Sequence, residues 1–216
     1  ASLLAMHLRP RERAPSRARL AADFLEGLRY AAASAPIRTI LLLLALVSLT
    51  GIPYAVLMPV FATDVLGGGP HTLGLLMAAS GAGAVTGALW LASRRSVLGL
   101  GRTLAIAGGV FGAGLVAFSL ARSLWLSMVL LAFVGGGMMI QMAASNTLLQ
   151  TIVDEDKRGR VMSFFAMAFF GMAPFGSLLA GWFGDRVGAP ATVRWGGVAT
   201  IVGVALFVLK LPELRR

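Results

Sequence analysis

The sequence predicts an all-α integral membrane protein with six transmembrane helices. Hydrophobic residues make up 57% of the 216 residues even before the 27 glycines are counted, whereas soluble domains contain about 45–50% apolar residues with glycine included. Mean hydropathy is +0.82, and the few charged residues gather in short clusters between long apolar stretches. These observations exclude an ordinary soluble globule and a disordered polyelectrolyte.

The net charge of +10 and the absence of cysteine narrow the chemistry further. A nucleic-acid surface needs basic side chains on one polar face, which this distribution does not provide. We therefore expect the lipid bilayer, and not nucleic acid, as the partner. Without cysteine there is no disulfide or thiolate site, and we expect no metal site and no cofactor.

Six apolar stretches are long enough, or nearly so, to cross about 30 Å of hydrocarbon, which takes about 20 residues. They cover residues 39–63, 73–93, 103–121, 123–150, 161–184 and 191–209, so that the bundle occupies 39–210 and a short tail 211–216 follows. Turn-forming residues separate most of them, at 67–70, 99–101, 154–159 and 188–190. The last stretch spans if Arg194 snorkels to the interface.

The distribution of Lys and Arg sets the expected orientation, because cations near span ends are retained on the cytoplasmic side. Seven cations precede the first span, and three follow each of the second, fourth and sixth spans. Only Arg122, Arg186 and Arg194 fall in the alternate loops. Both ends of the segment are therefore expected in the cytoplasm.

The amino end predicts two features. Residues 1–8 form an apolar stub that is too short to span, and we interpret it as the tail of a truncated preceding transmembrane helix. Residues 9–38 form a basic cytoplasmic loop with an amphipathic helix, in which Leu20, Phe24 and Leu28 recur every four residues. This helix either lies flat on the membrane interface or packs on cytoplasmic loops.

Several stretches, taken in order, resemble the major facilitator superfamily of transporters, and in particular its bacterial drug and siderophore exporters of the enterobactin-exporter type. The segments are EGLRY (26–30), LMPVF (57–61), LGGG (66–69), LGLL (73–76), RGRVMS (158–163), PFGSLLAG (174–181) and GDRVG (184–188). The resemblance implies that this chain is the carboxy-terminal six-helix half of such a transporter. The missing amino-terminal half would be its partner.

The resemblance also implies a function and a location. It suggests proton-coupled export of hydrophobic or amphiphilic small molecules, by alternating access, from the inner membrane of a bacterial cell. One departure is the loop after the second span, where Arg94, Arg95 and Arg102 lack the acidic residue common in the superfamily. In the next basic loop, Arg158, Gly159 and Arg160 either latch the cytoplasmic loops of the two halves together or only determine topology.

In the superfamily the first and fourth spans of each half line the substrate cavity. Pro53 and Pro59 are expected to break the first span, and Pro174 to kink the fifth. The glycines at 135–137 predict a bend in the fourth span. The resemblance makes the following residues candidates for the cavity lining: Thr50 and Tyr54, four apart on one face, and Met138, Gln141, Met142, Ser145 and Asn146. The alternative is that these side chains only pack and bond neighbouring helices.

No carboxylate or histidine lies in the middle of a predicted span. His7 and His71 are outside the spans, Asp64 lies at the outer end of the first one, and the acids at 154–156 lie in a loop. A proton-coupling carboxylate would therefore belong to the missing half. An intramembrane protease needs a histidine inside the membrane beside its serine, so we expect no enzyme and no catalytic residue. A non-transporting six-span scaffold or assembly protein stays open as the alternative.

Overall fold

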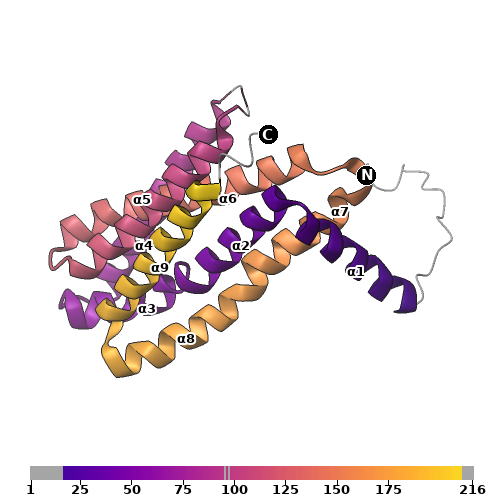
Figure 1. Ribbon diagram of the computed structural model, residues 1–216. Coiled ribbons are helices and arrows are strands. Elements are labelled where there is room, and N and C mark those ends of the chain that lie inside the picture. Colours follow the sequence, from indigo (N-terminus) through magenta and orange to yellow (C-terminus); the bar gives the residue numbers. More distant parts are fainter. Residues whose placement is uncertain (1–16, 95, 97, 211–216) are drawn as a thin grey trace, which may run out of the picture.

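The computed structural model describes residues 17–94, 96 and 98–210, and this part of the chain is helical throughout, without strands. The predictions for residues 1–16 and 211–216, and for Arg95, lie outside the described residues. Figure 1 shows the elements in order. They are α1 (Arg17–Ala33), α2 (Ala35–Thr50), α3 (Tyr54–Val60), the π-helical η2 (Phe61–Val65), α4 (Pro70–Ala92), α5 (Leu100–Leu120), α6 (Leu124–Ile152), α7 (Glu155–Ala166), the π-helical η3 (Met167–Gly171), α8 (Met172–Val187) and α9 (Ala189–Lys210).

Six of the described helical segments are long and apolar enough to cross a membrane, which confirms the predicted fold class. The segments cover Ala35–Val65, Pro70–Ala92, Leu100–Leu120, Leu124–Ile152, Glu155–Val187 and Ala189–Lys210. Most begin a few residues before the predicted apolar stretch, because the flanking residues favour helix starts. Pro70 occupies the first turn of α4. Glu155 and Asp156 lie in the first turn of α7, where the helix dipole favours negative charge.

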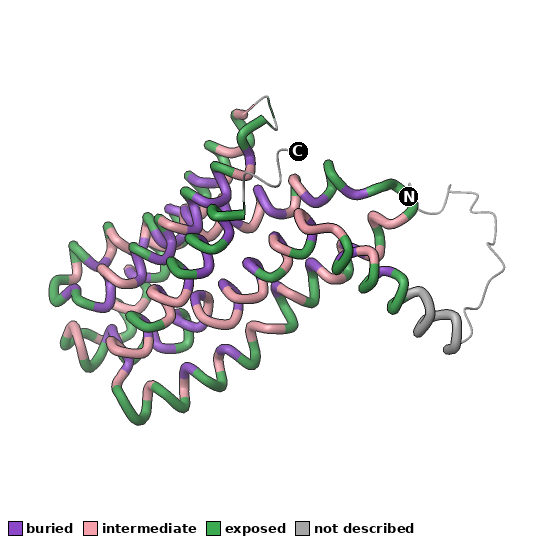
Figure 2. The backbone as a smooth tube through the Cα atoms, viewed as in Figure 1, coloured by how far each residue is buried: buried purple, intermediate pink, exposed green. Residues whose placement is uncertain are grey.

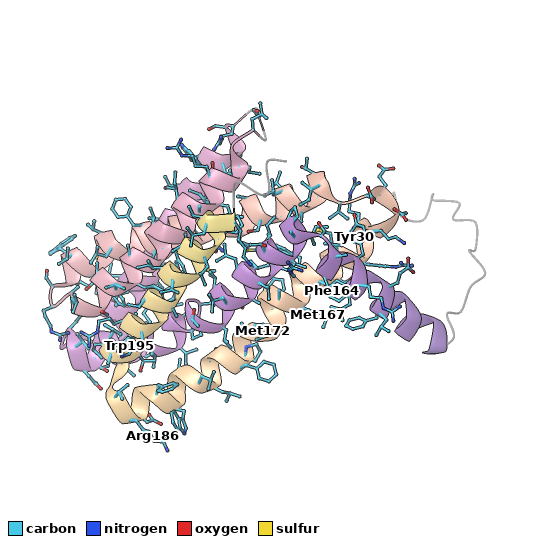
Figure 3. The ribbon with its side chains drawn as sticks, in the orientation of Figure 1. Tyr30, Phe164, Met167, Met172, Arg186 and Trp195 are labelled. Atoms are coloured by element: carbon cyan, nitrogen blue, oxygen red, sulfur yellow. The ribbon has the colours of Figure 1, made fainter. Side chains whose placement is uncertain are left out.

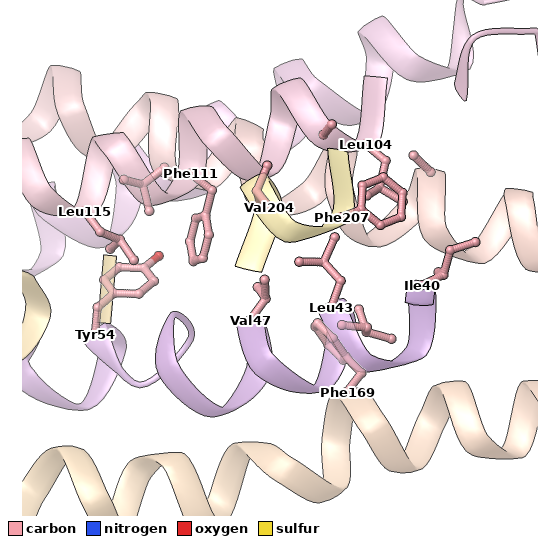
Figure 4. Packing of buried hydrophobic residues seen from close by; sticks show 14 of the residues in the cluster. Ile40, Leu43, Val47, Tyr54, Leu104, Phe111, Leu115, Phe169, Val204 and Phe207 are labelled. Carbon is pink, nitrogen blue, oxygen red and sulfur yellow. The ribbon is translucent and has the colours of Figure 1, made fainter. Parts of the chain in front are cut away.

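The tightest part of the bundle consists of α4, α5, α6 and α9. α6 packs against both α4 and α5, α5 packs against α9, and α4 contacts α6 far more extensively than its chain neighbour α5. α2 lies between α8 and α9 (Figure 4) and contributes Ile40, Leu43 and Val47 to the core. α1 and α7 lie together at one end, which we call the basic end (Figure 1).

Glycines hold the central helices at backbone contact distance. A Cβ atom added to Gly83 of α4 would lie 1.9 Å from the carbonyl oxygen of Ala132, and one added to Gly135 of α6 would lie 2.0 Å from that of Ser80. Small residues allow such approaches in lipid, where helices associate through close packing. At 135–137, where the sequence predicted a bend, α6 is α-helical without interruption, and the glycines contact α4 and α5.

Two of the six spans are discontinuous. The first breaks into a turn at residues 51–53 and passes into the π-helical η2 after Pro59, whose missing amide cannot continue the α-helical ladder. The fifth contains η3, which begins at Met167 and is followed directly by Met172, the first residue of α8 (Figure 3). Pro174 lies in the first turn of α8. The hydroxyl of Ser48 in α2 donates to the carbonyl of Phe169 in η3, so a neighbouring helix bonds a carbonyl in the irregular segment.

The outer helices expose apolar side chains, as a lipid-facing surface requires. Only Gly176 and Ala180 are buried in α8, and Figure 2 shows how little of this helix is covered. Its large apolar residues, among them Phe175, Leu178 and Trp182, are exposed. Such side chains are stable against acyl chains and would not be stable against water.

Replacement of Gly83 by alanine should loosen the α4–α6 contact, because the new methyl group would overlap the Ala132 carbonyl. We expect a loss of roughly 1–3 kcal/mol in the free energy of unfolding. Gly81→Ala is the matched control, since a Cβ at Gly81 meets no atom within 4 Å, and it should change stability by less than about 0.5 kcal/mol. Thermal unfolding in detergent compares the two variants. Equal stability of both would contradict the close contact.

Candidate functional site

The predicted face of α6 divides into an inward and an outward group. Gln141 and Ser145 are both buried with 1% of their surface exposed. The Ser145 hydroxyl donates to the Gln141 carbonyl at 2.8 Å. The Cγ atom of Gln141 lies 3.7 Å from where a Cβ of Gly108 would be, so this side chain reaches toward α5. Its Nε2 atom is buried and has no hydrogen-bond acceptor among the described residues.

The other three candidates on α6 are half-buried. Met138 and Met142 pack against the hydrophobic core, and the side-chain oxygen of Asn146 accepts a hydrogen bond from the amide of Gln150. The structure thus brings Gln141 and Ser145 together, whereas the side chain of Asn146 bonds Gln150.

Thr50 and Tyr54 contact different helices, unlike the shared face expected from their spacing. Thr50 Oγ1 donates to the Leu46 carbonyl at 2.8 Å and lies 3.4 Å from Thr200 Oγ1 of α9. Tyr54 OH lies 3.0 Å from Ser80 Oγ of α4. The physical reason is the break at residues 51–53, which separates the end of α2 from the start of α3.

Tyr54 is the centre of a junction between three helices. Its side chain is buried, and its ring meets the Phe111 ring of α5 edge-on with centroids 6.3 Å apart (Figure 4). The hydroxyl contact with Ser80 adds α4. The arrangement can hold the second half of the first span in place beside the break.

Sequence reasoning missed Ser48, Ser80 and Thr200, which supply the polar contacts to Phe169, Tyr54 and Thr50. Each is a hydroxyl residue in an apolar span. Such a residue is a usable signal, since a hydroxyl in lipid bonds its own helix or a neighbouring one, but it does not identify the neighbour.

Two of the predicted site residues line a groove between α2, α8 and α9. Thr50 and Pro53 face it from α2 and the break, and Phe183 and Trp195 face it from α8 and α9. The groove encloses about 450 Å³ and its lining is mostly apolar. It can accept an apolar group, with the Thr50 hydroxyl as one polar contact.

At the basic end, an ion-pair cluster attaches α1 to α7. Glu26 of α1 bonds the ammonium group of Lys157, and its second carboxylate oxygen lies 2.8 Å from Nη1 of Arg160. Tyr30 donates to the carboxylate of Asp154 at 3.0 Å. Arg158 lies 3.7 Å from Glu155 within α7, and Gly159 is exposed.

Apolar contacts support the same attachment. The rings of Phe24 and Phe164 meet edge-on with centroids 5.1 Å apart, and a Cβ on Gly27 would lie 3.1 Å from Arg160 Cβ. Figure 3 shows Tyr30 and Phe164 at this contact. Phe24 and Leu28 stay about half exposed, so α1 packs on α7 and keeps an apolar face for a second surface.

The ion-pair cluster changes the pKa of the Glu26 carboxylate. Its pKa is lowered because Lys157 donates a hydrogen bond to it and Arg160 adds a second bond and a favourable charge. A lowered pKa means that the attachment is fully present above the ordinary glutamate value, near pH 4.3. It is lost as the pH falls through the lowered value.

A comparison with known families agrees with the membrane architecture. A family model described as transmembrane secretion effector (MFS_3) matches residues 1–216. The match therefore covers α1 and all six spans.

Glu26→Gln should release α1 from α7, because it removes the charge that Lys157 and Arg160 share. Spin labels on Arg29→Cys and Ser163→Cys measure the separation, and the chain has no other cysteine. We expect a narrow distance distribution at pH 7 that broadens on acidification below about pH 4.3 and is broad throughout in Glu26→Gln. Glu155→Gln is the control, because that acid pairs within α7. A distribution that is unchanged by Glu26→Gln would refute the role of the cluster.

Proposed function

This chain belongs to the transmembrane secretion effector family of major facilitator transporters, and on this basis we propose that it is one six-helix half of an exporter. The exporter moves hydrophobic or amphiphilic small molecules out of a bacterial cytoplasm by alternating access. The other half is a second six-helix bundle, and the site lies between the two.

The buried amide of Gln141 is the observation that carries the proposal of a substrate site. A buried donor without an acceptor costs about 1–3 kcal/mol, and unpartnered groups of this kind are rare in native structures. Gln141 has such a donor in the middle of a span. We infer that Nε2 bonds a substrate group, or a residue of the other half, in another state of the transport cycle.

The neighbouring residues support the same site. Met138 and Met142 lie one helical turn apart on α6 and are half-buried. Thioether side chains adapt to apolar molecules of different shape. With the amide of Gln141, they suit molecules that combine an apolar body with a few polar groups. Asn146, also predicted for this site, faces another direction and bonds Gln150.

The discontinuous spans supply the points at which movement is least costly. The turn at residues 51–53 and the π-helical η2 and η3 interrupt the α-helical ladder. Hinge movement within a half uses segments that can change their backbone angles. In this proposal Pro53, Pro59 and Pro174 keep these segments irregular.

Protons are proposed as the driving ion, with the titrating carboxylate in the other half. The acids of the described spans lie near span ends, at Asp64, at 155–156 and at Asp185. We place both ends of this segment in the cytoplasm, since the short loops at the basic end hold most of the cations.

Gln141→Leu should abolish export while it preserves stability, because leucine fills the same space without a buried donor. We expect at least a tenfold fall in the efflux of amphiphilic dyes from membrane vesicles that contain the full-length protein, and a thermal unfolding temperature that is equal or higher.

Ser127→Ala is the control, because Ser127 is also buried on α6 without a described partner but lies in the first turn of the helix, far from the middle of the span. This variant should keep full efflux. Unchanged efflux in Gln141→Leu would remove Gln141 from the site. A parent protein that moves no amphiphile, with or without a proton gradient, would favour the scaffold alternative.

A further inference from the structure

A second groove, between α4, α5 and α6, takes no part in the proposed export. It encloses about 600 Å³ and is lined by apolar residues apart from two threonines. Ala82 and Trp90 mark its two ends on α4, Ile106 lines it from α5, and Phe133 lines it from α6. Ile106, Phe133 and Trp90 are about half exposed or more, so the groove opens on the outside of the described bundle.

One end of this groove carries a fixed cation. Arg94 donates a hydrogen bond to the hydroxyl of Thr103, and its guanidinium lies 5.5 Å from the centroid of the Trp90 ring. Both Thr103 and Trp90 line the groove. A further bond of 3.2 Å to the Leu98 carbonyl holds the second Nη atom. These bonds use two of the five donors of a guanidinium and leave others for an anion.

Among the described residues, the charge of this end has no acidic partner. The loop from Ser93 to Arg102 contains three arginines and no Asp or Glu, and no carboxylate of the described residues forms an ion pair with Arg94. Arg102 is exposed at the start of α5. An apolar groove with an unneutralised basic end complements an amphiphile with an anionic head.

The length of the groove fits a lipid of one leaflet. Ala82 and Trp90 are eight residues apart on α4, or about 12 Å along the helix axis. Half of the hydrocarbon core is about 15 Å. The groove therefore runs from the interface, where tryptophan side chains accumulate, to near the bilayer midplane.

We propose that this groove binds one acyl chain of an anionic phospholipid, with the phosphate held by Arg94. The lipid belongs to the leaflet at the basic end, where anionic headgroups meet juxtamembrane cations. The acyl chain occupies the space between α4 and α5, which contact each other little. The site is independent of Gln141 and of transport.

Trp90 reports on the site directly. Trp125, Trp182 and Trp195 are all exposed and are replaced by phenylalanine. Trp90 is then the only tryptophan of the protein. The protein is reconstituted in phosphatidylcholine vesicles that contain phosphatidylglycerol or phosphatidylcholine brominated near the headgroup end of the chain. We expect brominated phosphatidylglycerol to bind about fivefold more strongly, as judged by quenching of Trp90, since each cation near an anionic surface contributes about 1 kcal/mol.

Matched variants separate the head and the chain. Arg94→Gln should reduce the fivefold preference to near unity, whereas Arg122→Gln, at the other end of α5, should keep it. Ala82→Phe should fill the groove and reduce quenching by both brominated lipids, and Val85→Phe, on another face of α4, should not. Ile106→Phe is a second filling variant if Ala82→Phe does not fold.

Three results would overturn the proposal. Equal binding of the two lipids by the parent protein would exclude an anion site. Full quenching in both filling variants would exclude an acyl chain from the groove. No quenching of Trp90 by either lipid would show that protein, such as a second copy, covers this face.

Discussion

Backbone contact between helices is the constraint on which this structure depends. A bilayer gives little gain for the transfer of an apolar side chain from lipid to protein, so the helices associate through close van der Waals contact. α6 provides it on two sides, with Gly135 against α4 and Gly137 against α5, and Gly197 of α9 meets Gly112 of α5 in the same way. The buried position of Gln141 and the groove beside α4 both follow from this core.

The number of spans could be predicted from the sequence because an apolar run of sufficient length has few alternatives in a protein. The role of the glycine triplet at 135–137 could not. In water a run of glycines favours a turn, but in lipid the backbone amides have no water to bond, so the helix persists. The same residues then serve contact with α4 and α5, a role that requires knowledge of the neighbours.

The candidate site was only partly predictable, for reasons of rotation and of helix breaks. Gln141 and Asn146 are five residues apart, which corresponds to about 140° around a helix, and the structure gives them different surroundings. Thr50 and Tyr54 are four apart, but the break between them redirects each to another helix. The hydroxyl partners come from other spans, Ser80 from the next one and Thr200 from the last one described, and a single sequence holds no record of such pairs.

The packing of α4 on α6 rather than on α5 also has a consequence for biogenesis. Spans enter the membrane in order as the chain is synthesised, yet α4 acquires its main partner only after α5 has passed and α6 has arrived. α5 packs on α6, the next span, but completes its contacts only with α9, and α2 also makes much of its contact with α9. The early hairpins therefore reside in the bilayer without their final neighbours, and the tight core can close only when the last span has left the translocation machinery.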